Sequence, residues 1–115
     1  MSEGDVALAA LPQADGQNKA LPVILLRAMP PFGDWLVCGV STQVHHEVVG
    51  FDDVINASAT DFRHSGLKAD SLLRLGFLAV FPRERLLGVL GSISPERHQR
   101  LLQRLSAFLQ PARKS

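Results

Sequence analysis

Apolar residues along the chain fall into short runs separated by polar, proline-containing or glycine-containing segments. Four runs have the length of strands and end near turn-forming residues: 6–11, 21–29, 35–40 and 71–81. A shorter run, 86–90, ends at Gly91. The run 21–29 is apolar apart from Arg27, which is typical of a strand that is buried on both faces.

The last element has the pattern of an amphipathic helix. Ser94, Pro95 and Glu96 supply an N-cap hydroxyl, a proline for the first turn and an acid near the positive end of the helix dipole. Apolar residues then recur at helical spacing as far as Pro111. They are Leu101, Leu102, Leu105, Phe108 and Leu109. Three arginines, which are Arg97, Arg100 and Arg104, line another face, and we expect that face to be solvated.

The segments between these elements are less regular. A polar turn around Asp15 and Gly16 is expected over 13–19, and 48–55 is interpreted as an edge strand with a bulge at Gly50. The stretch 56–68 is expected to be a long loop, which in a compact domain is often functional. The tail 112–115 is expected to fray.

Several strands followed by one helix predict a mainly β, α+β fold. We expect residues 1–115 to form a single domain, a curved antiparallel sheet or small barrel with the helix packed against it. Hydrophobic residues make up 46% of the 115 positions. This fraction is high for a small monomer and favours a dimer that buries the excess apolar surface.

Charge and cysteine content narrow the setting of the protein. The net charge of +1 requires any nucleic-acid binding to come from a local cluster of arginine and lysine. One cysteine, Cys38, forms no intrachain disulfide, which favours a reducing cytoplasm. The acidic N-terminus argues against a signal peptide, and no apolar run approaches the roughly 20 residues of a membrane span.

Few residues suggest chemistry on their own. Cys38 lies in an apolar strand and is expected to be a buried hydrophobe. His45 and His46 would point to opposite faces of a strand and therefore not chelate one metal. His64 is either a general acid–base candidate or a solvated loop histidine. Arg74 interrupts an apolar run, and its structural and functional interpretations are equally supported.

Five stretches, in order, resemble toxins of the MazF/PemK family of type II toxin–antitoxin systems. They are Gly4–Val6, Lys19–Leu25, Asp34–Gln43, Ser65–Ser71 and Gly88–Glu96. Together they extend over most of the chain. Each stretch is short, so the resemblance depends on their order and spacing.

The resemblance implies an SH3-like, CcdB/MazF-like barrel with a C-terminal helix, usually as a homodimer. It also implies a growth inhibitor that cleaves single-stranded RNA by attack of the ribose 2′-hydroxyl, without a metal or cofactor. The implied partners are RNA and an antitoxin protein, with no membrane and no DNA. Such chemistry needs a base, an acid and a cation near the phosphate.

The family's functional positions match this sequence unevenly. The resemblance places a phosphate-contacting hydroxyl at Ser41, with Thr42 beside it, and an arginine at Arg74. Leu21 and Gly76 stand where the family has an arginine and an aspartate. Lys19 is the candidate replacement for the missing arginine, although an ammonium lacks the fork of a guanidinium. The candidate RNA-binding residues are Arg27, Arg63, His64 and Lys68.

Three functions follow from this comparison. The first is an active endoribonuclease, and the second is a catalytically degenerate module that dimerises and binds an antitoxin or RNA without cleaving it. The third is a gyrase poison of the CcdB branch, which acts through a hydrophobic end of the helix. The end here, 109–115, is polar and basic, so we expect no effect on DNA supercoiling.

Overall fold

The computed structural model describes residues 1–12 and 14–112, so residue 13 of the expected turn and 113–115 of the expected frayed tail lie outside the described residues. Six strands are followed by one long helix, as the apolar runs predicted. The strands are β1 (Asp5–Pro12), β2 (Asn18–Met29), β3 (Asp34–Ser41), β4 (Asp53–Ile55), β5 (Ser71–Phe81) and β6 (Leu86–Ser92). The helices are η1 (Val44–His46), α1 (Phe62–Ser65), η2 (Arg83–Arg85) and α2 (Pro95–Phe108).

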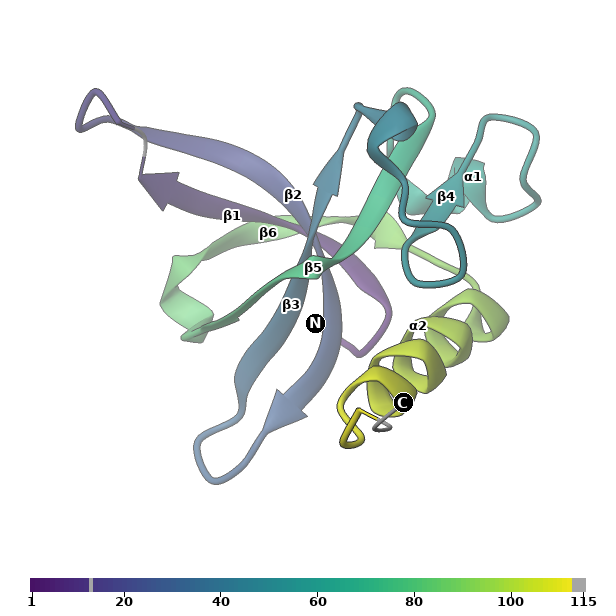
Figure 1. The fold of residues 1–115 in the computed structure, drawn as a ribbon. Coiled ribbons are helices and arrows are strands. Elements are labelled where there is room, and N and C mark those ends of the chain that lie inside the picture. The colour runs from purple at the N-terminus through teal and green to yellow at the C-terminus, as the bar shows by residue number, and fades with distance from the viewer. Residues whose placement is uncertain (13, 113–115) are drawn as a thin grey trace.

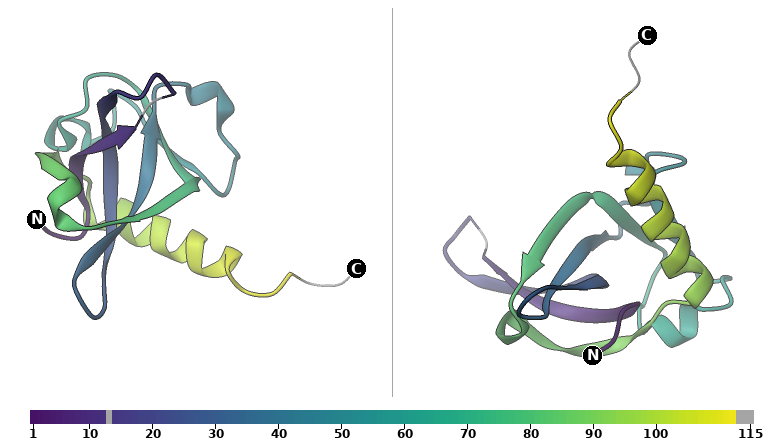
Figure 2. Two further views of the ribbon diagram at one scale, coloured as in Figure 1. Left: turned by 90° about the vertical axis from the view of Figure 1, so that its left-hand side faces the viewer. Right: turned by 90° about the horizontal axis from the view of Figure 1, so that it is seen from below.

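The strands form one antiparallel sheet with the order β4-β5-β3-β2-β1-β6 (Figure 1). The sheet is strongly curved, and α2 lies along one side of it (Figure 2). This confirms the mainly β architecture with a C-terminal helix. In the part of the chain that the structure describes, β4 and β6 are the two ends of the hydrogen-bonding order.

Helix α1 packs against one of those two edge strands. It follows β4 in the chain, yet it packs against β6. Gly66 ends α1 with φ +73°, and a Cβ at this position would collide with the backbone carbonyl of Leu90. A Cβ at Gly91 would collide in the same way with the carbonyl of His64. The two glycines therefore permit a backbone-to-backbone approach that no larger residue allows.

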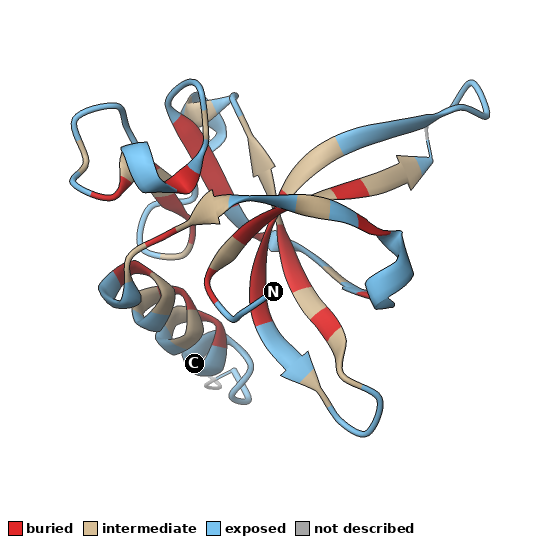
Figure 3. Cartoon of the chain, turned by 180° about the vertical axis from the view of Figure 1, so that it is seen from behind, coloured by how far each residue is buried: buried red, intermediate tan, exposed pale blue. Residues whose placement is uncertain are grey.

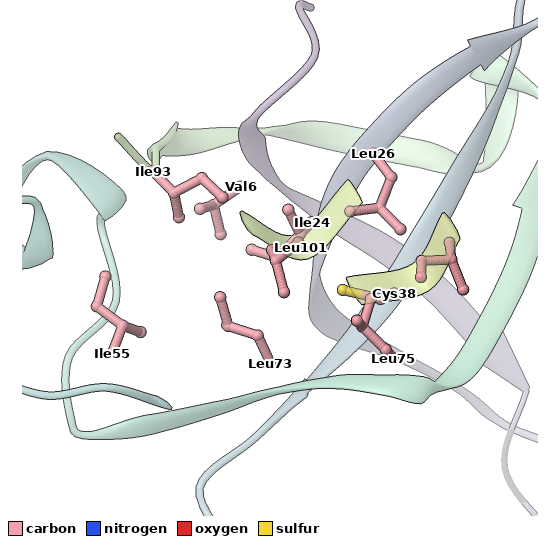
Figure 4. Close-up of a cluster of buried hydrophobic side chains, with 10 residues drawn as sticks. Val6, Ile24, Leu26, Cys38, Ile55, Leu73, Leu75, Ile93 and Leu101 are labelled. Carbon is pink, nitrogen blue, oxygen red and sulfur yellow. The ribbon is translucent and has the colours of Figure 1, made fainter. Parts of the chain in front are cut away.

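Apolar side chains are buried on both faces of the central strands (Figure 3). The helix-side cluster contains Val6, Ile24, Leu26, Cys38, Ile55, Leu73, Leu75, Ile93, Leu101 and Leu105 (Figure 4). The second cluster lies on the other face of the central strands and is called the sheet-side cluster. It contains Ala7, Ala9, Val23, Leu25, Trp35, Val37, Phe81 and Leu86. Successive residues of β2 alternate between the two clusters, which confirms that this strand is buried on both faces.

A bulge in β5 changes the face of the sheet to which the later side chains of this strand point. Cys38 pairs with Leu78, but the next residue, Gly39, pairs with Arg74, so residues 75–77 are extra on the β5 side. An odd number of extra residues moves later side chains to the opposite face. Leu73 accordingly belongs to the helix-side cluster, whereas Phe81 belongs to the sheet-side cluster.

The segment 48–55, predicted as an edge strand with a bulge, is mostly a turn. Only Asp53–Ile55 pair with β5. The amides of Phe51 and Asp52 donate to the carbonyl of Val48, and the amide of Val48 donates to Oδ2 of Asp52 at 2.9 Å. The carboxylate of Asp52 thus closes the turn on itself, an alternative to pairing that short acidic side chains offer. The predicted long loop 56–68 also contains the unpredicted helix α1.

The expectation that the arginines of α2 form a solvated face was wrong. Arg97 is buried; its Nη1 donates to Oδ2 of Asp53 at 2.8 Å and its Nε donates to Oδ2 of Asp61 at 2.8 Å. Nη2 of Arg100 donates to Asp53 at 2.9 Å, and Nη1 of Arg104 donates to the carbonyl of Asp52. These carboxylates lie more than thirty residues earlier in the chain, so the helical pattern alone does not reveal them.

Candidate functional site

A hollow of about 670 Å³ opens between the sheet and the segment that joins α1 to β5. Its polar lining comes from the end of β3 and from that segment; the residues are Ser41, Thr42, Gln43, Lys68 and Ser71. Its apolar lining includes Leu8, Leu21, Pro22, Val40, Leu67 and Leu90. Among the described residues, Lys68 is the one charged residue that lines it.

A smaller hollow of about 140 Å³ adjoins it. Leu21, Pro22, Val40 and Ser41, at neighbouring ends of β2 and β3, line both hollows, and the two hollows together are called the groove. The smaller hollow adds Arg74. Lys68 lines only the larger hollow and Arg74 only the smaller one, and each offers an anion charge-assisted hydrogen bonds. No carboxylate and no imidazole is among the residues that line the two hollows.

Arg74 faces the smaller hollow because it lies between Leu73 and Leu75, whose side chains are buried in the helix-side cluster on the other face of the strand. Its partner across the sheet, Gly39, lies in the same hollow, and the ring of Phe77 packs against Gly39. The Arg74 side chain is exposed, and within residues 1–12 and 14–112 it pairs with no carboxylate. Its guanidinium is therefore available to a ligand.

The hydroxyl positions lie where β3 ends. Oγ of Ser41 accepts a hydrogen bond from the amide of Gln43 at 3.0 Å, which fixes the chain as it leaves the strand. Thr42 is exposed beside it. Ser41 thus lines both hollows, Thr42 and Lys68 line the larger one, and Arg74 lines the smaller one.

Leu21 and Gly76 also belong to this region. Leu21 lines both hollows, so an apolar side chain occupies the wall where the family resemblance places an arginine. Gly76 is exposed, and a Cβ added there meets no atom within 4 Å. Lys19 is exposed and pairs with Leu11, which lines the smaller hollow.

The other predicted RNA-binding residues lie elsewhere. Arg27 is near the end of β2, with its Nε 3.3 Å from Oε2 of Glu3. Arg63 is exposed on α1 and lines neither hollow. His64 lines a separate hollow of about 290 Å³ beside the start of α2. The groove therefore collects only part of the predicted set.

The histidine pair was expected to lie in a strand, and this expectation was wrong. His45 and His46 belong to η1, and their ring centroids are 4.2 Å apart. Among residues 1–12 and 14–112, no group of three His, Cys, Asp or Glu side chains is arranged to hold a metal ion. Cys38 is fully buried, and burial raises the pKa of its thiol to about 12, so it is the buried hydrophobe that the apolar run predicted.

Sequence reasoning missed the buried charged residues, which are Asp52, Asp53, Asp61 and Arg97. Hydrogen bonds from Arg97 lower the pKa of Asp61 to about 2, and the same aspartate raises the pKa of Arg97 against the opposing effect of burial. Asp52 is also buried, and its Oδ1 accepts a hydrogen bond from the amide of Leu75 in the β5 bulge. The one signal in the sequence was the pair of aspartates at 52 and 53 next to an otherwise apolar segment.

Comparisons with known structures agree with this architecture. The chain is similar to the Mycobacterium tuberculosis toxin MazF-mt6, with a TM-score of 0.68 and 18% identity over 95% of this chain and 99% of that one. It is also similar to an endoribonuclease solved with its cognate antitoxin from a mycobacterial species. There the TM-score is 0.69, with 14% identity over 98% of this chain and 99% of that one. No curated protein sequence matches the chain.

No described helix is long and apolar enough to span a membrane. A family model described as "PemK-like, MazF-like toxin of type II toxin-antitoxin system" matches residues 2–109. The match covers both core clusters, the groove and all of α2. The chain therefore belongs to the PemK-like, MazF-like toxin family of type II toxin–antitoxin systems.

Proposed function

We propose that the protein is the toxin of a toxin–antitoxin system and a metal-independent endoribonuclease that cleaves single-stranded RNA in the groove. One observation carries this proposal: Ser41 lines two adjoining hollows, with Arg74 in one and Lys68 in the other, and the guanidinium of Arg74 has no carboxylate partner in the described chain. Such donors suit a phosphodiester, because a fixed guanidinium binds two phosphate oxygens at once.

The reaction is an intramolecular transfer within the RNA. The ribose 2′-oxygen attacks the adjacent phosphorus while its proton passes to a base, and the bond from phosphorus to the 5′-oxygen breaks as that oxygen takes up a proton. Charge accumulates on the phosphoryl oxygens in the transition state. Arg74 stabilises this charge, Ser41 and Thr42 orient the phosphate, and Lys68 and Lys19 bind neighbouring parts of the backbone.

The residues that line the groove also predict a low rate of RNA cleavage. It contains no carboxylate or imidazole that would act as the base, and Leu21 supplies no charge at the wall it forms. Losing one charge-stabilising donor typically costs about 100- to 1,000-fold in rate. We therefore expect cleavage that is slow for an enzyme of this kind.

The apolar wall at Leu21 favours a second candidate function. In this alternative, the protein is a catalytically degenerate module whose groove binds RNA or an antitoxin segment without cleaving it. Leu21, Pro22, Val40 and Leu67 would then contact apolar side chains or bases of the ligand.

We also propose that the protein is a cytoplasmic homodimer, with residues 1–115 forming one domain and the curved sheet closing as an SH3-like barrel. The support for a dimer is a set of exposed apolar side chains on β5 and β6. They are Phe77, Leu78, Val80, Leu87, Val89 and Leu90, each at least 40% exposed. Exposed apolar side chains in such numbers favour burial against a second copy of the chain.

An RNA cleavage assay separates the two functions. Pure protein is incubated with a long unstructured RNA in the presence of EDTA, and cleavage is compared with that of Arg74→Ala. We expect slow cleavage by the wild type and a loss of about 100-fold or more in the variant. Wild-type cleavage that is unaffected by Arg74→Ala would contradict the catalytic role. RNA binding that weakens in Arg74→Ala without any cleavage by the wild type would favour the binding module.

Arg85→Ala is a matched control for this assay. Arg85 is exposed on η2, with its guanidinium carbon 5.7 Å from the centre of the Phe81 ring, and it lines neither hollow. The Arg85→Ala substitution removes the same charge without changing the groove, so we expect cleavage at the wild-type rate. Expression of the gene in bacteria, with and without Arg74→Ala, tests growth inhibition in the same way.

A further inference from the structure

The bulge in β5 leaves backbone amides without partners in the sheet ladder. Residues 75–77 lie between the pairs Gly39–Arg74 and Cys38–Leu78, so they have no residue opposite them on β3. A buried amide without an acceptor is costly, and native structures supply one. Here the acceptor is a side chain: the amide of Leu75 donates to Oδ1 of Asp52 at 3.1 Å.

Asp52 is built to hold this position. Its side chain comes from the turn that precedes β4, and the residue is 4% exposed. The second carboxylate oxygen accepts from the amide of Val48 at 2.9 Å, so both oxygens bind backbone. The carbonyl of the same residue accepts from Nη1 of Arg104 in α2. Asp52 therefore ties the bulge to a turn and to the long helix.

The amide that Asp52 binds is next to the residue proposed to contact phosphate. Leu75 directly follows Arg74, whose exposed side chain has no ion-pair partner in the described chain to orient it. The direction of the Arg74 side chain therefore depends on the backbone at 74–77. From this geometry we infer that Asp52 is a positioning residue: its carboxylate fixes the backbone directly after Arg74 and thereby keeps the Arg74 side chain directed into the groove. This inference rests on the proposed function for its catalytic consequence, but not for its structural one.

Two variants remove the hydrogen bonds in steps. Asp52→Asn keeps the shape of the side chain but only one acceptor oxygen, while Asp52→Ala removes both. Asp61→Asn is the matched control, because Asp61 is also a buried carboxylate that binds backbone and arginine, and it lies outside the bulge. Both asparagine variants are expected to lose stability. Only the Asp52 variants should affect Arg74.

The structural readout needs no RNA. Hydrogen exchange of the Leu75 amide should be at least 10-fold faster in Asp52→Asn than in Asp61→Asn when the two are compared at equal global stability. Backbone order parameters from NMR relaxation should fall at residues 74–77 only in Asp52→Asn. Unchanged exchange and unchanged order parameters in a folded Asp52→Asn protein would overturn the inference. If Asp52→Ala does not fold, the measurements on Asp52→Asn decide whether Asp52 holds the bulge.

The catalytic readout is a double-mutant cycle. In single-turnover cleavage of RNA, Asp52→Asn should lower the rate about 10-fold, with a smaller change in RNA affinity. In the Arg74→Ala background the same substitution should have no further effect, because its action passes through Arg74. Equal losses in both backgrounds would mean that Asp52 acts only on stability. If the wild type does not cleave RNA, the proposed activity fails, and the exchange and relaxation data still decide the role of Asp52.

Discussion

Arg97 and Asp61 form a bidentate pair in which Nε donates to Oδ2 at 2.8 Å and Nη2 donates to Oδ1 at 3.0 Å. The pair joins the N-cap of α1, Asp61, to the first turn of α2, and Oδ2 of Asp61 also accepts from the amide of Ser94 at 2.9 Å. Both residues are less than 10% exposed. Buried charges of this kind make stability depend on pH and on each partner being present.

The pKa of Asp61 predicts an acid dependence. Because its pKa is about 2 in the folded protein and 3.8 without the fold, the pair stabilises the protein fully above the unfolded value. That contribution, about 2 kcal/mol, is lost as the pH falls from about 5 through 3.8 towards 2. Urea unfolding at several pH values should show a wild-type advantage over Asp61→Asn that shrinks in this window. A constant difference between pH 6 and pH 3 would contradict it.

Removing Arg97 should cost far more than removing Arg100. Arg97→Ala leaves two buried carboxylates, Asp53 and Asp61, without their main partner, and such a break typically costs about 3–5 kcal/mol. The Arg100 side chain is 42% exposed and shares Asp53 with Arg97, so Arg100→Ala should cost less than about 1 kcal/mol. The free energy of unfolding in urea at pH 7 measures both. Similar losses in the two variants would be evidence against this ranking.

The glycines predict a second contrast in stability. Gly66 and Gly50 both have positive φ, at +73° and +85°, where an alanine is strained by about 1–2 kcal/mol. A Cβ at Gly50 meets no atom within 4 Å, whereas a Cβ at Gly66 collides with the carbonyl of Leu90. Gly66→Ala should therefore destabilise the protein clearly more than Gly50→Ala. Thermal unfolding of the two variants gives the comparison, and equal midpoints would show that α1 can move away from β6.

Gly76→Asp should increase RNA cleavage. The position is exposed and open, so the side chain fits without a clash, and its carboxylate would lie two residues from Arg74, where it could accept the proton of the 2′-hydroxyl. We expect at least a 10-fold faster rate in Gly76→Asp, and a larger gain when Leu21→Arg is added. Gly76→Asn is the control of equal size without charge. Gains that are the same for asparagine would point to backbone rigidity instead of chemistry.

Cys38 should resist alkylation in the folded protein. Its thiol has a pKa of about 12 and is buried in the helix-side cluster, so almost no thiolate is present or accessible at pH 8. Iodoacetamide should label the protein only after unfolding in urea, which mass spectrometry detects. Labelling at the rate of a free thiol would mean that the helix-side cluster opens readily.

The sequence predicted the elements whose apolar pattern is complete. β2, β3, β5 and α2 have long runs with clear ends, and the buried residues of the three strands fall within those runs. Asp53 and Arg97 show why the buried charges were missed: each is polar in its own segment, and only their contact across 44 positions makes burial favourable. A pattern read along the chain carries no information about such a pair.

The candidate site was likewise predicted only in part from the sequence. Ser41 and Lys68 were found because short stretches around them resemble a family, and the structure places Ser41 in both hollows, Lys68 in the larger one and Arg74 in the smaller one. Their placement in adjoining hollows was not predictable from the sequence, since it depends on how β3 pairs with β5. Arg63 and His64 share a short helix whose existence was missed, and that helix directs them away from the groove.

The bulge in β5 limits which insertions and deletions the strand can accept. Because its three extra residues exchange the two faces of the strand, Leu73 and Phe81 reach different clusters although both have odd positions in the chain. Removing one residue from 75–77 would send the whole second half of β5 to the wrong face, while removing two would preserve the facing of both halves. Among natural and engineered variants, length changes at this point should therefore occur in steps of two.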